Sequence, residues 1–221
     1  FFHPIQWFCL KYLGYQAHSH SVAILNGFLV RTTHLLGTRY HIYHEQKISE
    51  NQPIVWVCNH QSLYDIPPII WFMRKYHPKF ISKIELGKGI PSVSFNLRYG
   101  GSVLIDRKNG GDAVKKIESI AHYINKYNRS VVIFPEGTRS KTGVPKTFHR
   151  NGLKTLIKNA PNALFIPVSI NNSWKMQRYG MFPLGLFNQI TFIFHKPLKL
   201  QTTDEDLIDE LEKMVVSGIK S

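Results

Sequence analysis

A short stretch in the first third of the chain decides the fold class. Residues 54–65 read IVWVCNHQSLYD, which is five apolar residues followed at once by a polar turn. The apolar run is typical of a buried β-strand, and similar runs recur along the chain. The other expected strands are residues 40–44, 79–81, 102–105, 131–134, 164–170 and 190–194. Because helical stretches alternate with them, we expect an α/β fold.

Helical periodicity is clearest over residues 113–127, where apolar side chains repeat on one face and Asp112 stands as the expected N-cap. Further helices are expected at residues 66–73, 151–158 and 207–216. For the last of these, Thr202 and Glu205 predict a capping box, in which each side chain bonds the other's backbone N–H.

The first 38 residues form a distinct segment. Residues 2–12 and 22–36 read as two amphipathic helices with Trp and Phe on one side and Lys or Arg nearby, a composition typical of an interfacial membrane anchor. The alternative is that both helices simply cover the protein's own core. Residues 12–30 lack Lys, Arg, Asp and Glu but contain too many polar residues for a good spanning helix. We therefore expect a membrane-association segment at 1–38 and one domain at 39–221.

Composition narrows the class of partner. Hydrophobic residues make up 43% of the chain, which is too many for a disordered protein. Two cysteines exclude a disulfide-dense secreted scaffold. The excess of 28 Lys and Arg over 14 Asp and Glu gives a net charge of +14, so the partners are expected to be anionic. Nucleic acid, an anionic membrane and phosphorylated small molecules all fit that charge. The basic residues are scattered and no nucleic-acid motif is present.

The polar turn after residues 54–58 contains the first candidate for catalysis. His60 leaves the strand, and Asp65 follows five residues later. A turn can fold the carboxylate back onto the imidazole, fix its tautomer and so make the histidine a general base. The alternative is a surface histidine beside an aspartate that caps the next helix.

A second candidate follows the strand in residues 101–107, which read GSVLIDR. At the end of a strand, where ligand sites of α/β proteins gather, Arg107 could reach a bound anion. The alternative is that Asp106 and Arg107 form an ordinary turn that faces solvent.

The third candidate is the turn in residues 131–140, which read VVIFPEGTRS. Gly137 permits close approach of a backbone, Thr138 offers a hydroxyl, and Arg139 can bind a phosphate with two parallel hydrogen bonds. The turn is not a P-loop, because Gly-x4-Gly-Lys-Ser/Thr is absent. Four basic or titratable residues follow, at Lys141, Lys146, His149 and Arg150. They would enrich an anion site or form a solvated basic loop.

Taken together, these three sequence motifs, or boxes, resemble those of a known family. Asn-His-x4-Asp at 59–65, Gly-x3-Ile-Asp-Arg at 101–107 and Phe-Pro-Glu-Gly-Thr-Arg-Ser at 134–140 occur in the order found in glycerophospholipid acyltransferases. A fourth box of that family, with Val/Ile-Pro-Val in an apolar strand, is matched by residues 165–170. Within the family the chain is most similar to the bacterial 1-acylglycerol-3-phosphate (lysophosphatidic acid) acyltransferase type.

The resemblance implies a reaction and a set of site residues. His60 would take the proton from the sn-2 hydroxyl of 1-acylglycerol 3-phosphate, Asp65 would orient it, and the alkoxide would attack an acyl thioester directly. The substrate-binding positions implied by the family are Lys83, Arg107, Glu136, Gly137, Thr138, Arg139 and Pro167. Among them Arg107, Arg139 and Lys83 would bind the acceptor phosphate, and Pro167 would line the acyl-donor side.

The resemblance also implies the setting of the reaction. We expect a single α/β acyltransferase domain with a mixed central sheet flanked by helices, at the cytoplasmic face of a membrane as a peripheral or monotopic protein. The donor would be acyl-carrier protein or acyl-coenzyme A, the acceptor a lysophospholipid, and the surface an anionic membrane. Neither a metal, a cofactor nor nucleic acid is expected. The alternative acceptors are glycerol 3-phosphate and a lyso-aminolipid such as lyso-ornithine lipid. A catalytically silent basic membrane-binding protein is a third reading, but the His60–Asp65 motif is intact.

Overall fold

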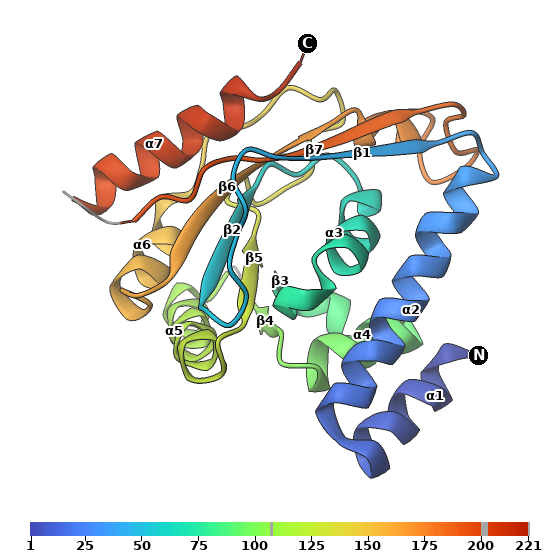
Figure 1. The fold of residues 1–221 in the computed structure, drawn as a ribbon, viewed down its shortest axis with the longest axis horizontal. Helices are drawn as coiled ribbons and strands as arrows, with labels where there is room; N and C mark the ends of the chain where they lie inside the picture. Colours follow the sequence, from blue (N-terminus) through green and yellow to red (C-terminus); the bar gives the residue numbers. More distant parts are fainter. Residues whose placement is uncertain (107, 200–202, 221) are drawn as a thin grey trace.

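The structure is a computed structural model that describes residues 1–106, 108–199 and 203–220. Within these residues, seven strands form one sheet in the order β1-β7-β6-β2-β5-β3-β4 (Figure 1). The strands are β1 (Arg39–His44), β2 (Ile54–Cys58), β3 (Pro78–Lys83), β4 (Val103–Ile105), β5 (Ser130–Ile133), β6 (Leu164–Asn171) and β7 (Gln189–Phe194). All the predicted strands are confirmed, with ends that shift by one or two residues.

The sheet is mixed, as predicted. The pairs β1–β7, β2–β5, β2–β6, β3–β5 and β3–β4 are parallel, and only β6–β7 is antiparallel among the described strands. Val55 of β2 lies in register with Val131 of β5 on one side and Phe165 of β6 on the other. The strand that decides the fold is thus central, which explains why it is apolar throughout.

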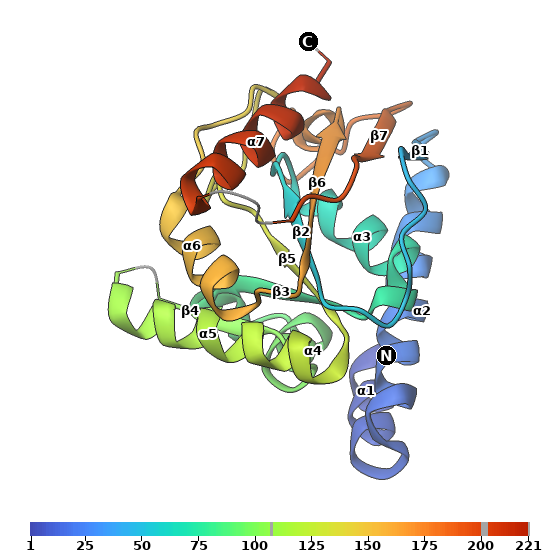
Figure 2. The same cartoon turned by 60° about the vertical axis from the view of Figure 1, so that its left-hand side comes forward.

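Helices cover both faces of the sheet and make three layers (Figures 1 and 2). On one face lie α5 (Gly110–Tyr127), α6 (Arg150–Asn159) and α7 (Asp204–Ser217), and on the other α2 (Gly14–His34), α3 (Ile66–Phe72) and α4 (Pro91–Tyr99). Alternation along β2 sends Val55 and Val57 into the core beneath α5–α7, and Ile54 and Trp56 into the opposite core. Each such buried side chain contributes about 1.5–3 kcal/mol.

Two helix starts differ from the predicted caps. The N-cap of α5 is Asn109, whose side chain accepts the backbone N–H of Asp112, so Asp112 lies inside the helix. The capping box of α7 is formed by Thr203 and Asp206. The predicted Thr202 lies outside the described residues, and the box is shifted by one position because Thr203 offers the same hydroxyl and Asp206 the same carboxylate.

The N-terminal segment is a helical hairpin. It consists of α1 (Phe2–Phe8), a π-helical turn (Cys9–Leu13) and α2, which begins eight residues before the predicted start. The inner face of α2 is buried on α3, and Gly27 lies so close to the Trp71 ring that a side chain there would clash. The outer face exposes Trp7, Phe8 and Phe28. The inner face thus covers the protein's own core, and the interpretation of the outer face as a membrane anchor stays a prediction. In the described part of the chain, no helix is both long and apolar enough to cross a membrane.

Candidate active site

The sequence boxes converge at one edge of the sheet. β2 lies between β5 and β6 and is parallel to both, so the carboxyl ends of the three strands meet there. His60 follows β2, Glu136 follows β5, and Ser173 follows β6. Ligands of α/β proteins bind at this edge, where loops leave the strands.

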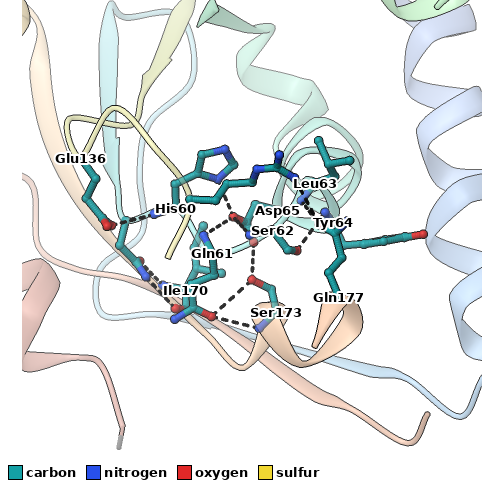
Figure 3. A network of polar contacts seen from close by, with 12 residues as sticks. His60, Gln61, Ser62, Leu63, Tyr64, Asp65, Glu136, Ile170, Ser173 and Gln177 are labelled. Carbon is teal, nitrogen blue, oxygen red and sulfur yellow. Dashed lines mark hydrogen bonds and ion pairs between the residues drawn. The ribbon is translucent and has the colours of Figure 1, made fainter. Parts of the chain in front are cut away.

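His60 and Asp65 form a hydrogen-bonded pair (Figure 3). His60 Nδ1 donates to Asp65 Oδ2 over 2.7 Å, which places the proton on Nδ1 and leaves Nε2 with a lone pair. No described residue bonds Nε2, and 18% of the imidazole side chain is exposed. The ring stacks on Phe134 with centroids 4.1 Å apart, which holds its orientation. This is the geometry of a general base.

Asp65 is fully buried, and a buried carboxylate needs partners at both oxygens. Its Oδ2 also accepts the backbone N–H groups of Gln61 and Ser62, at 2.8 and 3.0 Å. Ser62 caps the short helix Leu63–Asp65, so the turn itself brings the carboxylate back toward His60. The remaining oxygen, Oδ1, accepts a hydrogen bond from the Ser173 hydroxyl. The carboxylate of Asp65 is thus held both by its own turn and by the distant loop that contains Ser173.

Glu136 holds the first and third boxes together. Its two oxygens accept the backbone N–H groups of His60 and Lys146, at 2.9 and 3.0 Å. Ser140 adds a backbone bond to the carbonyl of His60 over 2.7 Å. Burial raises the pKa of Glu136, while the two amides, the nearby charge of Lys146 and that of His60 when it is protonated oppose that rise. Glu136 is placed to position His60, and its carboxylate is already occupied by the two amides.

The turn after Glu136 directs its polar groups outward. Gly137 has φ +70°, a conformation that favours glycine. Thr138 and Arg139 are exposed. Among described residues, the guanidinium of Arg139 hydrogen-bonds only the Gln177 side chain, over 3.4 Å, so it can bind a ligand. The Lys146 ammonium instead bonds the Thr138 hydroxyl and the Arg139 carbonyl, at 2.8 and 3.1 Å. Lys146 therefore supports the turn.

Of the other predicted phosphate ligands, Lys83 lies at the same edge, further along the sheet. Lys83 is exposed at the end of β3, in register with Ile105 at the end of β4. Arg107 comes two residues after Ile105, and it lies outside the described residues. Pro167 is buried within β6, in register with Val57, so the structure does not bring it into the polar cluster. Its place on the acyl-donor side stays a prediction.

The basic residues after the turn have two different roles: Lys146 supports the turn, and Arg150 binds α7. Arg150 forms ion pairs with Glu205 and Asp209 of α7, at 2.6 and 2.5 Å. Arg150 is thus paired with the acidic helix and is not part of the polar cluster around His60. Its pairing partners also explain why acidic residues gather at the start of α7.

Four polar residues of the site were not predicted from the sequence. The Asn59 side chain bonds both backbone groups of Ile170, at 2.9 and 2.7 Å, and so joins β2 to β6. Gln61 accepts the Ser173 backbone N–H at 3.1 Å. Gln177 accepts the Leu63 backbone N–H at 2.9 Å. A possible signal was the polar run Asn171–Ser173 directly after a buried strand.

A reactive thiol and a metal ion are the two alternatives to a histidine base. Burial and the nearby Asp65 raise the pKa of the Cys58 thiol well above its usual range, so this neighbouring thiol stays protonated. No three His, Cys, Asp or Glu side chains gather to hold a metal ion among the described residues. The chemistry that the geometry supports is deprotonation of a hydroxyl by His60.

The chain thus combines a mixed α/β sheet with a His–x4–Asp pair and an Arg-bearing turn at the carboxyl ends of its strands. A sequence model described as "Acyltransferase" matches residues 39–171, and the chain belongs to this family. The predicted family resemblance is therefore confirmed.

Three relatives illustrate the similarity. The chain is 30% identical over 171 residues to the 1-acyl-sn-glycerol-3-phosphate acyltransferase of Cocos nucifera, covering 75% of this chain and 52% of the relative. It is 35% identical over 131 residues to the enzyme of that name in Helicobacter pylori, covering 56% and 53%. The chain thus spans about half the length of these relatives. The crystal structure of the 1-acyl-sn-glycerophosphate acyltransferase from Thermotoga maritima superposes with a TM-score of 0.75 at 24% identity, covering 98% of this chain and 85% of that one, and shows the same fold.

Proposed function

We propose that the protein transfers a fatty acyl group from an acyl thioester to the sn-2 hydroxyl of 1-acylglycerol 3-phosphate, giving phosphatidic acid. The observation that carries this proposal is the His60–Asp65 pair, with Nε2 free at the carboxyl edge of the sheet. The names of the relatives in Cocos nucifera and Helicobacter pylori support the acceptor.

The reaction proceeds in one displacement. His60 Nε2 takes the proton of the acceptor hydroxyl as the oxygen attacks the thioester carbonyl. The C–O bond forms, the C–S bond breaks, and the imidazolium returns its proton to the leaving thiolate. Asp65, which bonds Nδ1, stabilises the imidazolium in between. Acyl-carrier protein and acyl-coenzyme A both supply the required thioester.

The acceptor phosphate is bound by Arg139, Lys83 and Arg107 in this proposal. Arg139 supports it best, because its guanidinium makes only one long hydrogen bond with a described residue. Arginine suits a phosphate because two parallel N–H groups match two oxygens. Glycerol 3-phosphate, which carries the same phosphate, is the alternative acceptor. A lyso-aminolipid would leave these cations without a ligand.

We place the reaction at the cytoplasmic face of a membrane. The outward aromatic residues of α1 and α2 would rest in the lipid interface, and the chain's positive charge would attract anionic lipids. In this arrangement the 1–38 segment associates with the membrane and residues 39–221 catalyse the transfer.

The test offers purified protein a panel of lysolipids, glycerol 3-phosphate and a lyso-aminolipid with both thioester donors, and identifies the products by mass. We expect phosphatidic acid from 1-acylglycerol 3-phosphate. His60→Ala should lower turnover by about 10²–10⁴-fold, the usual contribution of a general base. The control is His122→Ala, which changes an exposed histidine of α5. Near-normal turnover by His60→Ala would exclude the mechanism, and acylation of the lyso-aminolipid alone would exclude the acceptor.

A further inference from the structure

A second polar cluster lies at the opposite edge of the sheet, where β3 and β5 begin. Pro78 and Ser130 are in register at this edge; Lys79 follows Pro78 in β3, and Arg129 directly precedes β5. Both cations lie over the ring of Tyr15. Lys79 and Lys83 stand at opposite ends of the strand, about 13 Å apart at 3.3 Å per residue. The cluster is therefore separate from the candidate active site.

Lys79 is buried without a counter-ion. Its side chain is 6% exposed, and none of the described residues gives its ammonium a hydrogen bond or an ion pair. The ammonium lies over the Tyr15 ring, 4.7 Å from the centroid. Burial, together with Arg129, lowers the pKa of Lys79 to about 7. A buried cation in such surroundings is costly unless an anion accompanies it.

The neighbours of Lys79 add positive charge instead of compensating it. The Arg129 guanidinium stacks on Tyr15 at 3.5 Å and bonds the Tyr123 hydroxyl. Burial lowers the pKa of His77, and Lys79 and Arg129 lower it further. Within the described residues, no carboxylate pairs with any of these cations. Lys79, Arg129 and His77 thus form a cluster of basic groups that repel one another when charged.

Lys79 and His77, but not Arg129, face a small cavity beneath α2. Its volume is about 20 Å³, and the residues that line it include His18, Ser19, Arg74, His77, Lys79 and Asn96. His18 is 1% exposed, and its buried Nε2 has no hydrogen-bond partner among the described residues. Buried polar atoms normally have partners, so the His18 nitrogen, in a cavity also lined by the cationic Lys79, points to a polar ligand at this place.

We propose that this cavity binds a phosphate group, with Lys79 as its central cation and His18 as a second donor. One phosphate oxygen would occupy the cavity, which has room for about one water-sized group. The rest of the group would lie at the mouth, where Arg74 is exposed. An anion there supplies the charge that the cluster lacks and satisfies the donors left open.

The phosphate could come from solution or from the headgroup of an anionic lipid. The second source is suggested by α2, because its Tyr15, His18 and Ser19 border the cluster while Phe28 faces outward on the same helix. If that outer face rests on a membrane, a lipid headgroup lies within reach of the cavity mouth. The proposal concerns binding and does not depend on the acyl-transfer reaction.

The test measures phosphate binding where the candidate active site cannot contribute. All proteins carry Lys83→Ala, Arg107→Ala and Arg139→Ala, which remove the three cations proposed to bind phosphate at the candidate active site, and inorganic phosphate is titrated by calorimetry. We expect Lys79→Gln to weaken phosphate binding roughly ten- to a hundredfold, the effect of losing one charge-assisted hydrogen bond. Arg74→Gln, an exposed change that leaves the core intact, should weaken it in the same direction. Lys75→Gln is the matched control, since Lys75 is exposed and pairs with Glu50.

A second arm identifies the source of the phosphate. The same variants are floated with vesicles of phosphatidylcholine alone or of phosphatidylcholine mixed with phosphatidic acid. Loss of the phosphatidic-acid-dependent binding in Lys79→Gln supports a lipid headgroup, and loss of inorganic phosphate binding alone supports free phosphate. Equal phosphate and vesicle binding by the Lys79→Gln and control proteins would overturn the site, and Lys79 would then be a buried neutral amine.

Discussion

The Ser173 hydroxyl donates a hydrogen bond to Oδ1 of Asp65, the carboxylate oxygen that His60 leaves free. Ser173 is fully buried and 108 residues away from Asp65 along the chain. The aspartate that orients the histidine is therefore itself oriented from the far side of the site, by the loop after β6 (Figure 3).

This relationship predicts the effect of Ser173→Ala. A hydrogen bond to a charged group contributes about 1.5–3 kcal/mol, so turnover should fall roughly ten- to a hundredfold if the bond is needed to orient Asp65. The KM for the thioester donor should change little, because Ser173 acts on His60 through Asp65. Ser119→Ala is the control, since that hydroxyl is exposed and bonds only its own helix among the described residues. Unchanged turnover in Ser173→Ala would mean that the bond has no catalytic role.

Glu136→Gln should destabilise the site. The carboxylate accepts two backbone N–H groups, whereas an amide offers only one acceptor oxygen and turns its own N–H toward the other donor. We expect the free energy of unfolding to fall by about 1–3 kcal/mol, the cost of a buried unsatisfied donor. Denaturation in urea measures it, with Glu210→Gln on the exposed side of α7 as control. An equal stability of the two variants would contradict the positioning role.

The two side-chain bonds of Asp65, to His60 and to Ser173, show where sequence reasoning succeeds and where it stops. β2 is central in the sheet and buried throughout, so its sequence is apolar from Ile54 to Cys58, and this apolar run alone predicts the strand. His60 and Asp65 meet through a local turn, which spacing can indicate. The bond between Asp65 and Ser173 joins distant segments, and no local periodicity reports it.

Other misses have local physical causes. α4, spanning Pro91–Tyr99, was not predicted, because Ser94 and Leu97 are its only buried described side chains and it lacks an apolar stripe. Arg150 was a candidate anion ligand because its acidic partners on α7 lie more than fifty residues away. Adjacent threonines with equal capping ability explain the shifted start of α7, whose N-cap is Thr203.

Substitutions of Arg139 and of Lys146 should differ in how strongly they affect acceptors that carry a phosphate. Arg139→Lys should lower kcat/KM on 1-acylglycerol 3-phosphate roughly ten- to a hundredfold, because the point charge of lysine cannot reproduce two parallel bonds to phosphate. Arg107→Lys should act in the same direction. Lys146→Ala should have a smaller effect, since its ammonium already bonds the turn. Rates are compared on acceptors with and without phosphate. Equal losses on both acceptors would assign the arginines a structural role.

The outward aromatics of the N-terminal hairpin should control membrane binding. Trp7 and Phe28 are 44% and 53% exposed, so Trp7→Ser and Phe28→Ser should leave the thermal stability nearly unchanged. Partition onto anionic vesicles should weaken roughly tenfold or more for each, because burying a large apolar side chain contributes about 1.5–3 kcal/mol. Tyr43→Ser, in β1 and 57% exposed, is the control. Wild-type partition by both variants would rule out the anchor.

Lys79 should make the stability depend on pH in the alkaline range. Its folded pKa of about 7 lies below the ordinary value of 10.5, so between these values the unfolded chain binds more protons than the folded one. The free energy of unfolding therefore rises with pH, by up to about 1.4 kcal/mol per pH unit, and below about pH 7 this contribution is constant.

Lys79→Met removes the pH-dependent contribution of Lys79 to the free energy of unfolding. The difference in free energy of unfolding between wild type and variant therefore isolates this contribution from those of other titrating groups. We expect the variant to be the more stable protein near pH 7, because it buries no amine, and the advantage to shrink as pH rises toward about 10. Bound phosphate would keep Lys79 charged, so added phosphate should raise wild-type stability near neutral pH and flatten its rise with pH. A stability difference that does not change with pH would show that Lys79 keeps an ordinary pKa in the folded protein.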